Sequence, residues 1–299
     1  MDALGLGIDA GGTQTRWALA QRSGQIVAEG ALAGCSGNQM GSADGRAAVQ
    51  ALLSQLGAQV LAQAQPLAVC AGLSGFDGMT IEPAQWLAQA LNLPVDRISL
   101  RSDIEIAYFD SFAAGEGYLV YAGTGSIAAW IDADGSLQRA GGRGVLLDDG
   151  GGGYWIAREA LRNIWRQEDE APGCWQTSPM AQAVLARIGG SDWALSRQFV
   201  YGQERGALGE LALAVAASAD ADPVAYAILH AAGQELARLG LALVRRYGVR
   251  PIVLSGRAAS LHPVIASAMR AALPADIPLQ QKATLGHHAA ARIALHCHN

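Results

Sequence analysis

The feature that most constrains the fold is a strand–turn–strand pattern that occurs twice in the chain. In the first copy, "GIDAGGTQTRWALA" (7–20), an apolar run ends on Asp9, a Gly-Gly-Thr turn follows, and a second apolar run begins. The second copy, "YAGTGSIAAW" (121–130), repeats this order further along the chain. Short apolar runs joined by glycine-containing turns are typical of β-hairpins. The repetition predicts two similar domains, each offering one glycine-rich turn to a shared cleft.

The segments between the two copies alternate between helix and strand patterns. Apolar residues at three- and four-residue steps predict an amphipathic helix over 47–61. The runs "LAVCAGLSG" (67–75) and "RISLRSD" (97–103) are typical of buried strands, and a short helix is expected at about 104–114. Strands separated by helices predict the α/β class, with functional groups at the strand ends.

The second half of the chain is predicted to be mostly helical between residues 155 and 248. It contains helix patterns near 206–218 and near 222–247, and "RPIVLSGRAAS" (250–260) supplies a late strand. We expect one domain over 1–113 together with a C-terminal helix at about 286–299. The second domain is expected over 114–285.

Composition excludes several functional classes. The 299 residues are 51% hydrophobic and carry a net charge of −5, which gives no basic surface for nucleic acid. No apolar run is long enough to cross a bilayer, so no membrane partner is expected. The four cysteines are far apart and form no C-x-x-C pair, which favours reduced thiols in the cytoplasm and leaves no cysteine pattern for a structural zinc or an iron–sulfur cluster within this chain.

The two glycine-rich turns are candidate phosphate-binding loops. Backbone N–H groups in such turns form concavities that bind anions, and a neighbouring hydroxyl adds a donor. Taken alone, each turn is more often a plain hairpin, and the chain has neither a Walker loop nor a Rossmann fingerprint. The residues predicted to bind the nucleotide in these turns are Gly11, Gly12, Thr13, Thr15, Gly123, Thr124, Gly125 and Ser126.

Two aspartates end predicted strands of the first domain. Asp9 is a candidate Mg²⁺ ligand through water, because hard cations prefer carboxylate oxygens and keep much of their hydration. Its structural alternative is a cap of the turn that follows. Asp103 is a candidate general base, and its alternative is the N-cap of a helix beginning at Ile104.

An ordered set of motifs resembles one family. "GIDAGGTQTRWALA", "LSGFDG", "SDIEIA", "YAGTGS" and "GGRGVLLDDGGGGYWIAREAL" resemble the BadF/BadG/BcrA/BcrD ATPases, in particular the N-acetylglucosamine and glucosamine kinases, over essentially the whole chain. That family belongs to the superfamily of actin, hexokinase and the heat-shock ATPases. The resemblance implies two ribonuclease-H-like domains, each a mixed sheet flanked by helices, with ATP and a sugar in the cleft between them.

The resemblance also implies roles for individual residues. Asn38 in "CSGNQM" matches the sugar-binding asparagine, and Ser74 and Gly75 match a loop that lines the sugar site. Asp103 matches the catalytic aspartate that takes the proton from the attacking hydroxyl, and it also belongs to the sugar site. Further matches are Asp149, for an aspartate near sugar and metal, and Gly256, for the adenosine-binding turn.

Four departures from the family pattern stand out. The usual G-D-E-G-S stretch contains Asp148 and Asp149 followed by glycines, and Arg143 replaces an aromatic residue. Arg257 replaces the second glycine of the adenosine turn. His287 and His288 replace small residues near the C-terminus, whereas His296, Cys297 and His298 are interpreted as a frayed end. Trp155, Trp165 and Trp175 are interpreted as packing residues.

The first hypothesis is an ATP- and Mg²⁺-dependent kinase that phosphorylates the 6-hydroxyl of N-acetylglucosamine or glucosamine in the cytoplasm. An activator-type ATPase of the same family is an alternative, although such proteins use paired cysteines to bind an iron–sulfur cluster. A non-catalytic sugar or nucleotide sensor is the third hypothesis, suggested by the altered "DDGGGG" and "SGRAAS" stretches. A homodimer is plausible from the family alone.

Overall fold

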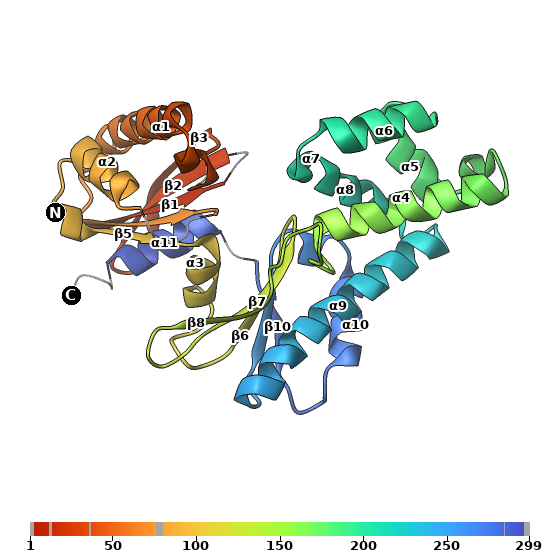
Figure 1. Cartoon of the computed structure of the whole chain (residues 1–299). Coiled ribbons are helices and arrows are strands. Elements are labelled where there is room, and N and C mark those ends of the chain that lie inside the picture. The colour runs from red at the N-terminus through yellow and green to blue at the C-terminus, as the bar shows by residue number, and fades with distance from the viewer. Residues whose placement is uncertain (1–2, 12–13, 36, 76–79, 284, 296–299) are drawn as a thin grey trace. The chain divides into compact units, whose positions relative to one another are not determined.

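The chain forms two compact units, each built on its own sheet (Figure 1). The structure is a computed structural model that describes residues 3–11, 14–35, 37–75, 80–283 and 285–295. Unit 1 comprises Met1–Phe112 and Thr284–Asn299, and unit 2 comprises Ala113–Ala283. Each unit has one five-stranded mixed sheet flanked by helices, so the predicted α/β class is confirmed.

The sheet of unit 1 has the strand order β3-β2-β1-β4-β5. Its strands are β1 (Leu4–Ala10), β2 (Gln14–Gln21), β3 (Ile26–Ala33), β4 (Ala68–Leu73) and β5 (Ile98–Arg101). The first three strands form an antiparallel meander, in which Asp9 of β1 lies opposite Arg16 of β2. Strands β4 and β5 continue the sheet in parallel with β1. The carboxyl ends of β1, β4 and β5 therefore lie at one edge of the sheet.

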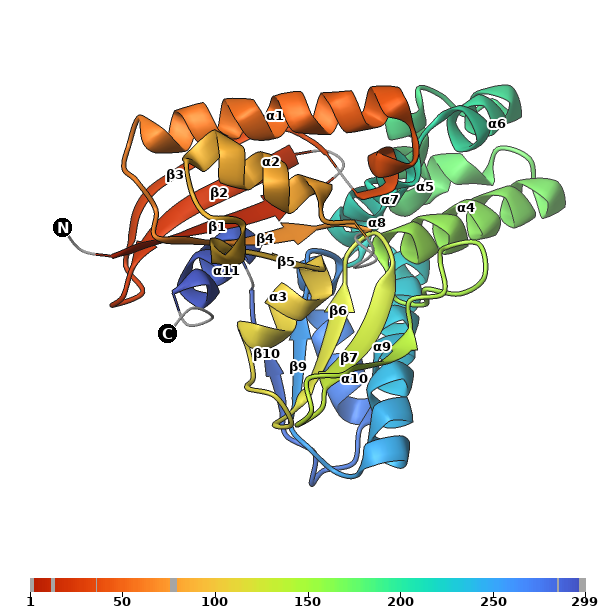
Figure 2. The same cartoon turned by 60° about the vertical axis from the view of Figure 1, so that its left-hand side comes forward.

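Helices cover both faces of this sheet (Figures 1 and 2). One face packs against α1 (Ala43–Leu61) and α2 (Glu82–Leu91) through a cluster of leucines, valines and isoleucines. The other face packs against α3 (Asp103–Phe109) and α11 (Gly286–Ala294). Short 3₁₀ turns, η1 (Gly37–Gly41) and η2 (Val95–Arg97), complete the described part of the unit.

Small residues allow α11 to lie directly on the strands. A Cβ on Gly7 would overlap the backbone of α11 at His287 and Ala291, and a Cβ on Gly5 would overlap the carbonyl oxygen of Ala291. On β2 the small side chains of Ala18 and Ala20 likewise allow close packing, here against Ala291. Because no side chain separates helix and sheet at these positions, the first turn of α11 is held close to Asp9.

The sheet of unit 2 repeats the arrangement of the first. Its strand order is β10-β9-β6-β7-β8, with β6, β7 and β8 antiparallel and with β9 and β10 parallel to β6. The strands are β6 (Tyr118–Ala122), β7 (Ser126–Ile131), β8 (Leu137–Gly141), β9 (Ile252–Ser255) and β10 (Leu279–Gln281). The repeat seen in the sequence therefore corresponds to a repeated sheet topology.

Unit 2 differs from unit 1 in the many helices that come between β8 and β9. They are α4 (Gly153–Glu170), η3 (Cys174–Thr177), α5 (Pro179–Ile188), α6 (Trp193–Gly202), α7 (Arg205–Gly209), α8 (Leu211–Ser218) and α9 (Pro223–Tyr247). The helix η4 (Ala258–Ser260) and α10 (Pro263–Ala272) follow β9. Among the described residues no single helix is long and apolar enough to span a membrane. Only the pair Arg205–Ser218 and Pro223–Tyr247, bent by 118°, meets that test when taken together.

Two helix predictions are corrected by the structure. The single helix expected near 206–218 is two helices, α7 and α8, that meet at Glu210. The helix expected over 104–114 ends at Phe109, with Asp110 as its C-cap. The first error arose because an alanine- and leucine-rich run gives an apolar pattern that carries little information about where the chain turns.

Candidate functional site

In unit 1, backbone hydrogen bonds connect the loops at the carboxyl edge of the sheet. The N–H of Ser74, just after β4, donates to the carbonyl of Ala10 at the end of β1 (2.9 Å). The carbonyl of Ser74 accepts from the N–H of Gly37 at the start of η1 (2.9 Å). The loop predicted to line a sugar site is thus joined to both the first strand and the segment that carries Asn38.

Asp103 lies at this edge, and it is not the helix cap that one interpretation of the sequence predicted. Ser102 is the N-cap of α3, in a capping box with Glu105: the Ser102 side chain accepts from the Glu105 N–H, and the Glu105 carboxylate accepts from the Ser102 N–H (2.9 Å). The Asp103 carboxylate instead accepts from the Ser74 hydroxyl (3.1 Å) and from the Ile104 N–H (2.9 Å). Burial raises its pKa.

Asp9 lies next to this group at the end of β1. Burial and the negative charge of Asp103 both raise the pKa of Asp9, while the charge of Arg16 lowers it. The α-carbon of Gly286, the first residue of α11, packs on the Asp9 carboxylate so closely that a Cβ there would lie 2.6 Å from Oδ2. Two half-buried carboxylates close enough to interact form a donor set that suits a hard divalent cation.

The remaining predicted residues of unit 1 have different environments. Gly11 closes the hairpin turn by donating from its N–H to the carbonyl of Gln14 (3.1 Å). Thr15 is fully buried, and its hydroxyl donates to the Cys35 sulfur (3.5 Å), so this hydroxyl serves packing within the unit. Gly75 has a φ of 76°. Gly12 and Thr13 lie outside the described residues, and Asn38 belongs to η1.

In unit 2, the turn between β6 and β7 supports the start of α4. The carbonyls of Gly123 and Thr124 accept from the N–H groups of Gly153 and Tyr154 (2.8 and 2.9 Å), which would otherwise be unpaired at the helix end. Thr124 is exposed at the tip of the turn. Ser126 is buried, and its hydroxyl donates to the carbonyl of Gly150 (2.7 Å).

Asp149 packs directly beneath this turn. It has a φ of 54°, a left-handed conformation that aspartate tolerates better than most residues. Its carboxylate accepts from the Gly144 N–H (3.2 Å) and lies so close to Gly125 that a Cβ there would overlap it. Burial raises the pKa of Asp149. The additional acid, Asp148, forms an ion pair with Arg238 of α9 (3.0 Å).

Gly256 follows β9 at the same edge of this sheet. Its φ is 101°, and its α-carbon packs against the carbonyl of Ala122, so a side chain would not fit here. Arg257, which replaces a second glycine, is exposed. The described nucleotide-binding residues predicted in unit 2 therefore all lie at the carboxyl edge of its sheet, where ligands bind in α/β proteins. Glycine-rich turns at such an edge suit a nucleotide phosphate chain.

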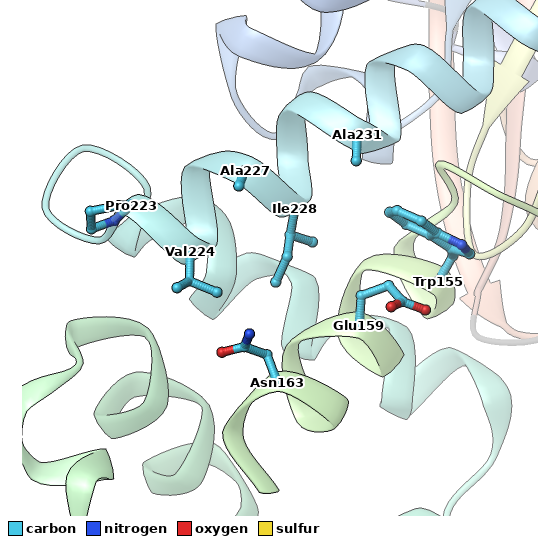
Figure 3. Close-up of a pocket in the computed structure, with 8 residues that line it drawn as sticks. All are labelled: Trp155, Glu159, Asn163, Pro223, Val224, Ala227, Ile228 and Ala231. Carbon is cyan, nitrogen blue, oxygen red and sulfur yellow. The ribbon is translucent and has the colours of Figure 1, made fainter. Parts of the chain in front are cut away.

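A pocket of about 470 Å³ is open on the helical part of unit 2 (Figure 3). Trp155, Glu159 and Asn163 of α4 line one side, and residues of α9 line the other. Glu159 is engaged in ion pairs with Arg158 and Arg162 (3.2 and 2.9 Å). No residue that the sequence predicted to bind a ligand lines this pocket. Trp165 packs edge-on against Trp193, in agreement with its interpretation as a packing residue.

The sequence analysis missed two residues that shape the site in unit 1. Arg16 lies opposite Asp9 in the hairpin and is a charge that favours its ionised form. The position of Arg16 could have been predicted from the hairpin, because the length of the turn determines which residues of the two strands lie opposite each other. Ser102 was overlooked as the cap, although its pairing with Glu105 three residues later is a recognised sequence signature.

Two units with the same five-stranded topology define an actin-like α/β ATPase fold. The chain belongs to the BadF/BadG/BcrA/BcrD ATPase family, whose model matches residues 6–278.

Individual relatives agree with this assignment. An N-acetyl-D-glucosamine kinase from Dictyostelium discoideum is 26% identical over 177 residues, which is 55% of each chain; this chain thus spans about half the length of that relative. A crystallised candidate N-acetylglucosamine kinase from Chromobacterium violaceum is 27% identical, with a TM-score of 0.71 over 98% of this chain and 99% of its own. A second one, from Porphyromonas gingivalis, shares the fold with a TM-score of 0.78 at 18% identity, covering 98% and 99% of the two chains.

Proposed function

We propose that this protein is an ATP-dependent kinase that phosphorylates the 6-hydroxyl of N-acetylglucosamine or glucosamine. The single observation that carries the proposal is the orientation and burial of the Asp103 carboxylate. The N-cap of its helix is Ser102, and one Asp103 oxygen accepts from the Ile104 N–H (2.9 Å) while the other accepts from the Ser74 hydroxyl (3.1 Å), so the carboxylate is held in one orientation. An oriented, partly buried carboxylate at a strand end is suited to act as a general base. The likeness to the amino-sugar kinases supports the choice of acceptor.

In the proposed reaction, Asp103 accepts the proton of the sugar hydroxyl as the oxygen attacks the γ-phosphorus of ATP. The bond between that oxygen and phosphorus forms while the bond to the β–γ bridging oxygen breaks, and ADP leaves. Mg²⁺, held through water by Asp9, would neutralise charge on the phosphates. Such transfers depend mainly on positioning and charge neutralisation, because the protein supplies little covalent chemistry.

The other predicted residues have supporting roles in this proposal. Ser74, Gly75 and Asn38 would bind the sugar, and Asp149 would orient the loop that carries Gly144. Gly11, Gly12 and Thr13 of unit 1, together with the turn Gly123–Ser126 and Gly256 of unit 2, would bind the nucleotide, with the exposed Thr124 as a hydroxyl donor. The Ser126 hydroxyl has a partner in Gly150, so we assign Ser126 to the shape of the turn rather than to phosphate contact.

The decisive experiment is a mass-spectrometric screen for sugar phosphate with MgATP and a panel of hexoses and amino sugars. We expect sugar phosphate to form with N-acetylglucosamine or glucosamine. Hexoses that lack nitrogen should be phosphorylated much more slowly. If every sugar bound without being phosphorylated, the sensor hypothesis would replace the kinase. Production of ADP without sugar phosphate would favour the activator-type ATPase.

The matching variant is Asp103→Asn. We expect turnover to fall by about a hundred- to ten-thousand-fold, because the amide cannot accept the proton. Sugar affinity should stay within a few-fold of wild type in a binding titration. The unfolding temperature should stay the same or rise, because the substitution removes a charge that burial disfavours. Glu116→Gln is the control, since Glu116 is an exposed acid whose carboxylate accepts from the Ala113 N–H. A native rate for Asp103→Asn would exclude Asp103 as the base.

The activator-type alternative receives no support from the cysteines that the structure describes. Cys35 and Cys70 are buried in unit 1, at 2% and 0% exposure. Cys174 belongs to unit 2, where its thiol lies 3.1 Å from the Glu168 carboxylate. Buried and scattered thiols are unsuited to a shared cluster, which needs paired and accessible ligands.

A further inference from the structure

A cluster of three metal-ligating side chains lies outside the residues assigned to the kinase reaction. Glu29 comes from the edge strand β3, and His287 and His288 come from the first turn of α11. One ligand atom from each residue lies within 4.8 Å of the other two. Glu29 Oε2 is 2.6 Å from Nε2 of His288 and 3.6 Å from Nε2 of His287.

The sheet register explains why these residues meet. Glu29 lies opposite Ala18 on the neighbouring strand, and Ala18 packs against Ala291 of α11. Residues opposite each other in a sheet project to the same face, so Glu29 projects to the face covered by α11. Because Ala18 has a small side chain, the Glu29 side chain can reach α11.

His287 is the most informative member of the cluster. It is 6% exposed, yet its Nδ1 has no hydrogen-bond partner among the residues that the structure describes. Its Nε2 is 3.6 Å from the Glu29 carboxylate, which is beyond a good hydrogen bond. Buried polar groups are nearly always satisfied, so an imidazole in this state calls for an explanation.

We propose that Glu29, His287 and His288 form a binding site for a divalent transition-metal ion, for which Zn²⁺ is the representative. Two imidazole nitrogens and one carboxylate oxygen are donors that suit Zn²⁺ and its first-row neighbours better than Mg²⁺ or Ca²⁺. Three protein ligands leave one position of a tetrahedral ion for water. The positive end of the α11 dipole disfavours a cation at this position, and the negative charge of the Glu29 carboxylate offsets that effect.

The ligand positions require only small side-chain adjustments. With zinc–ligand bonds of about 2.0–2.1 Å, tetrahedral donors lie roughly 3.3 Å apart. The 2.6 Å separation from His288 must therefore lengthen, and the more distant atoms must approach. Glu29 can make this adjustment because its side chain is 59% exposed. The bound ion would connect the edge strand to the helix whose first residue, Gly286, packs on Asp9.

The test is a Zn²⁺ titration of chelator-treated full-length protein in competition with a chromophoric chelator of micromolar affinity. Glu29→Gln and His288→Gln remove the two more accessible ligands and spare the buried His287. His230→Gln on α9 controls for adventitious binding by a single histidine. A triple variant, His296→Gln, Cys297→Ser and His298→Gln, controls for the chain end, which lies outside the described residues.

We expect wild type, His230→Gln and the terminal triple variant to bind one Zn²⁺ with the same affinity. Binding should weaken at least about tenfold in Glu29→Gln and in His288→Gln. Zn²⁺ should raise the unfolding temperature of wild type but not of these two variants. Co²⁺ should give a visible absorption spectrum that both variants alter. The proposal is overturned if wild type does not compete with the chelator, or if binding is lost only in the terminal variant.

Discussion

Ser74 and Asp103 interact through one hydrogen bond of 3.1 Å, and this bond has a consequence for pH dependence. Burial raises the pKa of Asp103, whereas the Ser74 hydroxyl lowers it by stabilising the ionised form. In the proposed reaction the base must be ionised, so kcat/KM falls as the pH decreases through the pKa of Asp103. The acidic limb should therefore lie above the ordinary range of an aspartate.

Ser74→Ala should move that limb to higher pH, because the stabilising hydroxyl is lost and the pKa of Asp103 rises further. The measurement is kcat/KM against pH for wild type and variant, since this ratio reports the free enzyme. Ser54→Ala is the control, because the Ser54 hydroxyl bonds only to the Gln50 carbonyl in α1. A limb that stayed in place, or moved to lower pH, would contradict the assignment of Asp103 as the base.

At the scale of elements, α11 depends on the absence of side chains beneath it. A Cβ on Gly7 would overlap the backbone nitrogen of Ala291 and the carbonyl of His287. Backbone atoms cannot rotate away, so the helix would have to move off the sheet. We expect Gly7→Ala to lower the free energy of unfolding by about 1–3 kcal/mol, the typical cost of overpacking.

Chemical denaturation of Gly7→Ala measures this loss. The control is Gly202→Ala at the end of α6, where an added Cβ meets nothing within 4 Å. That substitution should be neutral or stabilise by up to about 1 kcal/mol, because alanine favours helix. Equal stability of the two variants would show that α11 does not pack as closely on β1 as the structure indicates.

The start of α3 is the clearest case in which the local sequence contained a usable signal that the prediction did not use. Ser102 and Glu105 form a capping box, so the start of the helix was recognisable from two residues three apart. The division between α7 and α8 is different. Gly209 ends α7 and is a residue that often marks a helix end, but the apolar pattern continues past it, and both α7 and α8 pack against α4.

For the whole molecule, the proposed roles are divided: the sugar binds unit 1, and the turn between β6 and β7 of unit 2 supplies a large part of the nucleotide site, in addition to the first turn and Asp9 of unit 1. Gly125→Ala tests this division. The added Cβ would overlap the Asp149 carboxylate and displace the turn that is proposed to bind phosphate. In this variant, a non-hydrolysable ATP analogue with Mg²⁺ should no longer stabilise the protein against unfolding. N-acetylglucosamine should still stabilise it.

Thermal unfolding with each ligand separates the two effects. A ligand at a hundred times its Kd stabilises by about 2.7 kcal/mol, which is readily measured. Asp103→Asn should keep both stabilisations, and Gly202→Ala should do the same. If Gly125→Ala kept the full effect of the ATP analogue, the turn between β6 and β7 would not be the nucleotide site.

The repeated pattern, the fold class and the family could be inferred from the sequence alone. Two copies of a strand–turn–strand pattern indicated two similar units, and the structure contains two sheets of the same topology. The ordered motifs indicated the family, and the family model matches residues 6–278. These inferences succeed because hydrophobic periodicity and turn residues act over a few positions along the chain.

The partners of individual side chains could be seen only in the folded chain. Thr15 and Ser126 were predicted to bind phosphate, yet each hydroxyl has a buried partner contributed by a distant segment. Glu29 and His288 are 259 positions apart, and packing of α11 on small residues of β1 and β2 brings them into contact. Register and helix packing are non-local, so no short sequence window contains them.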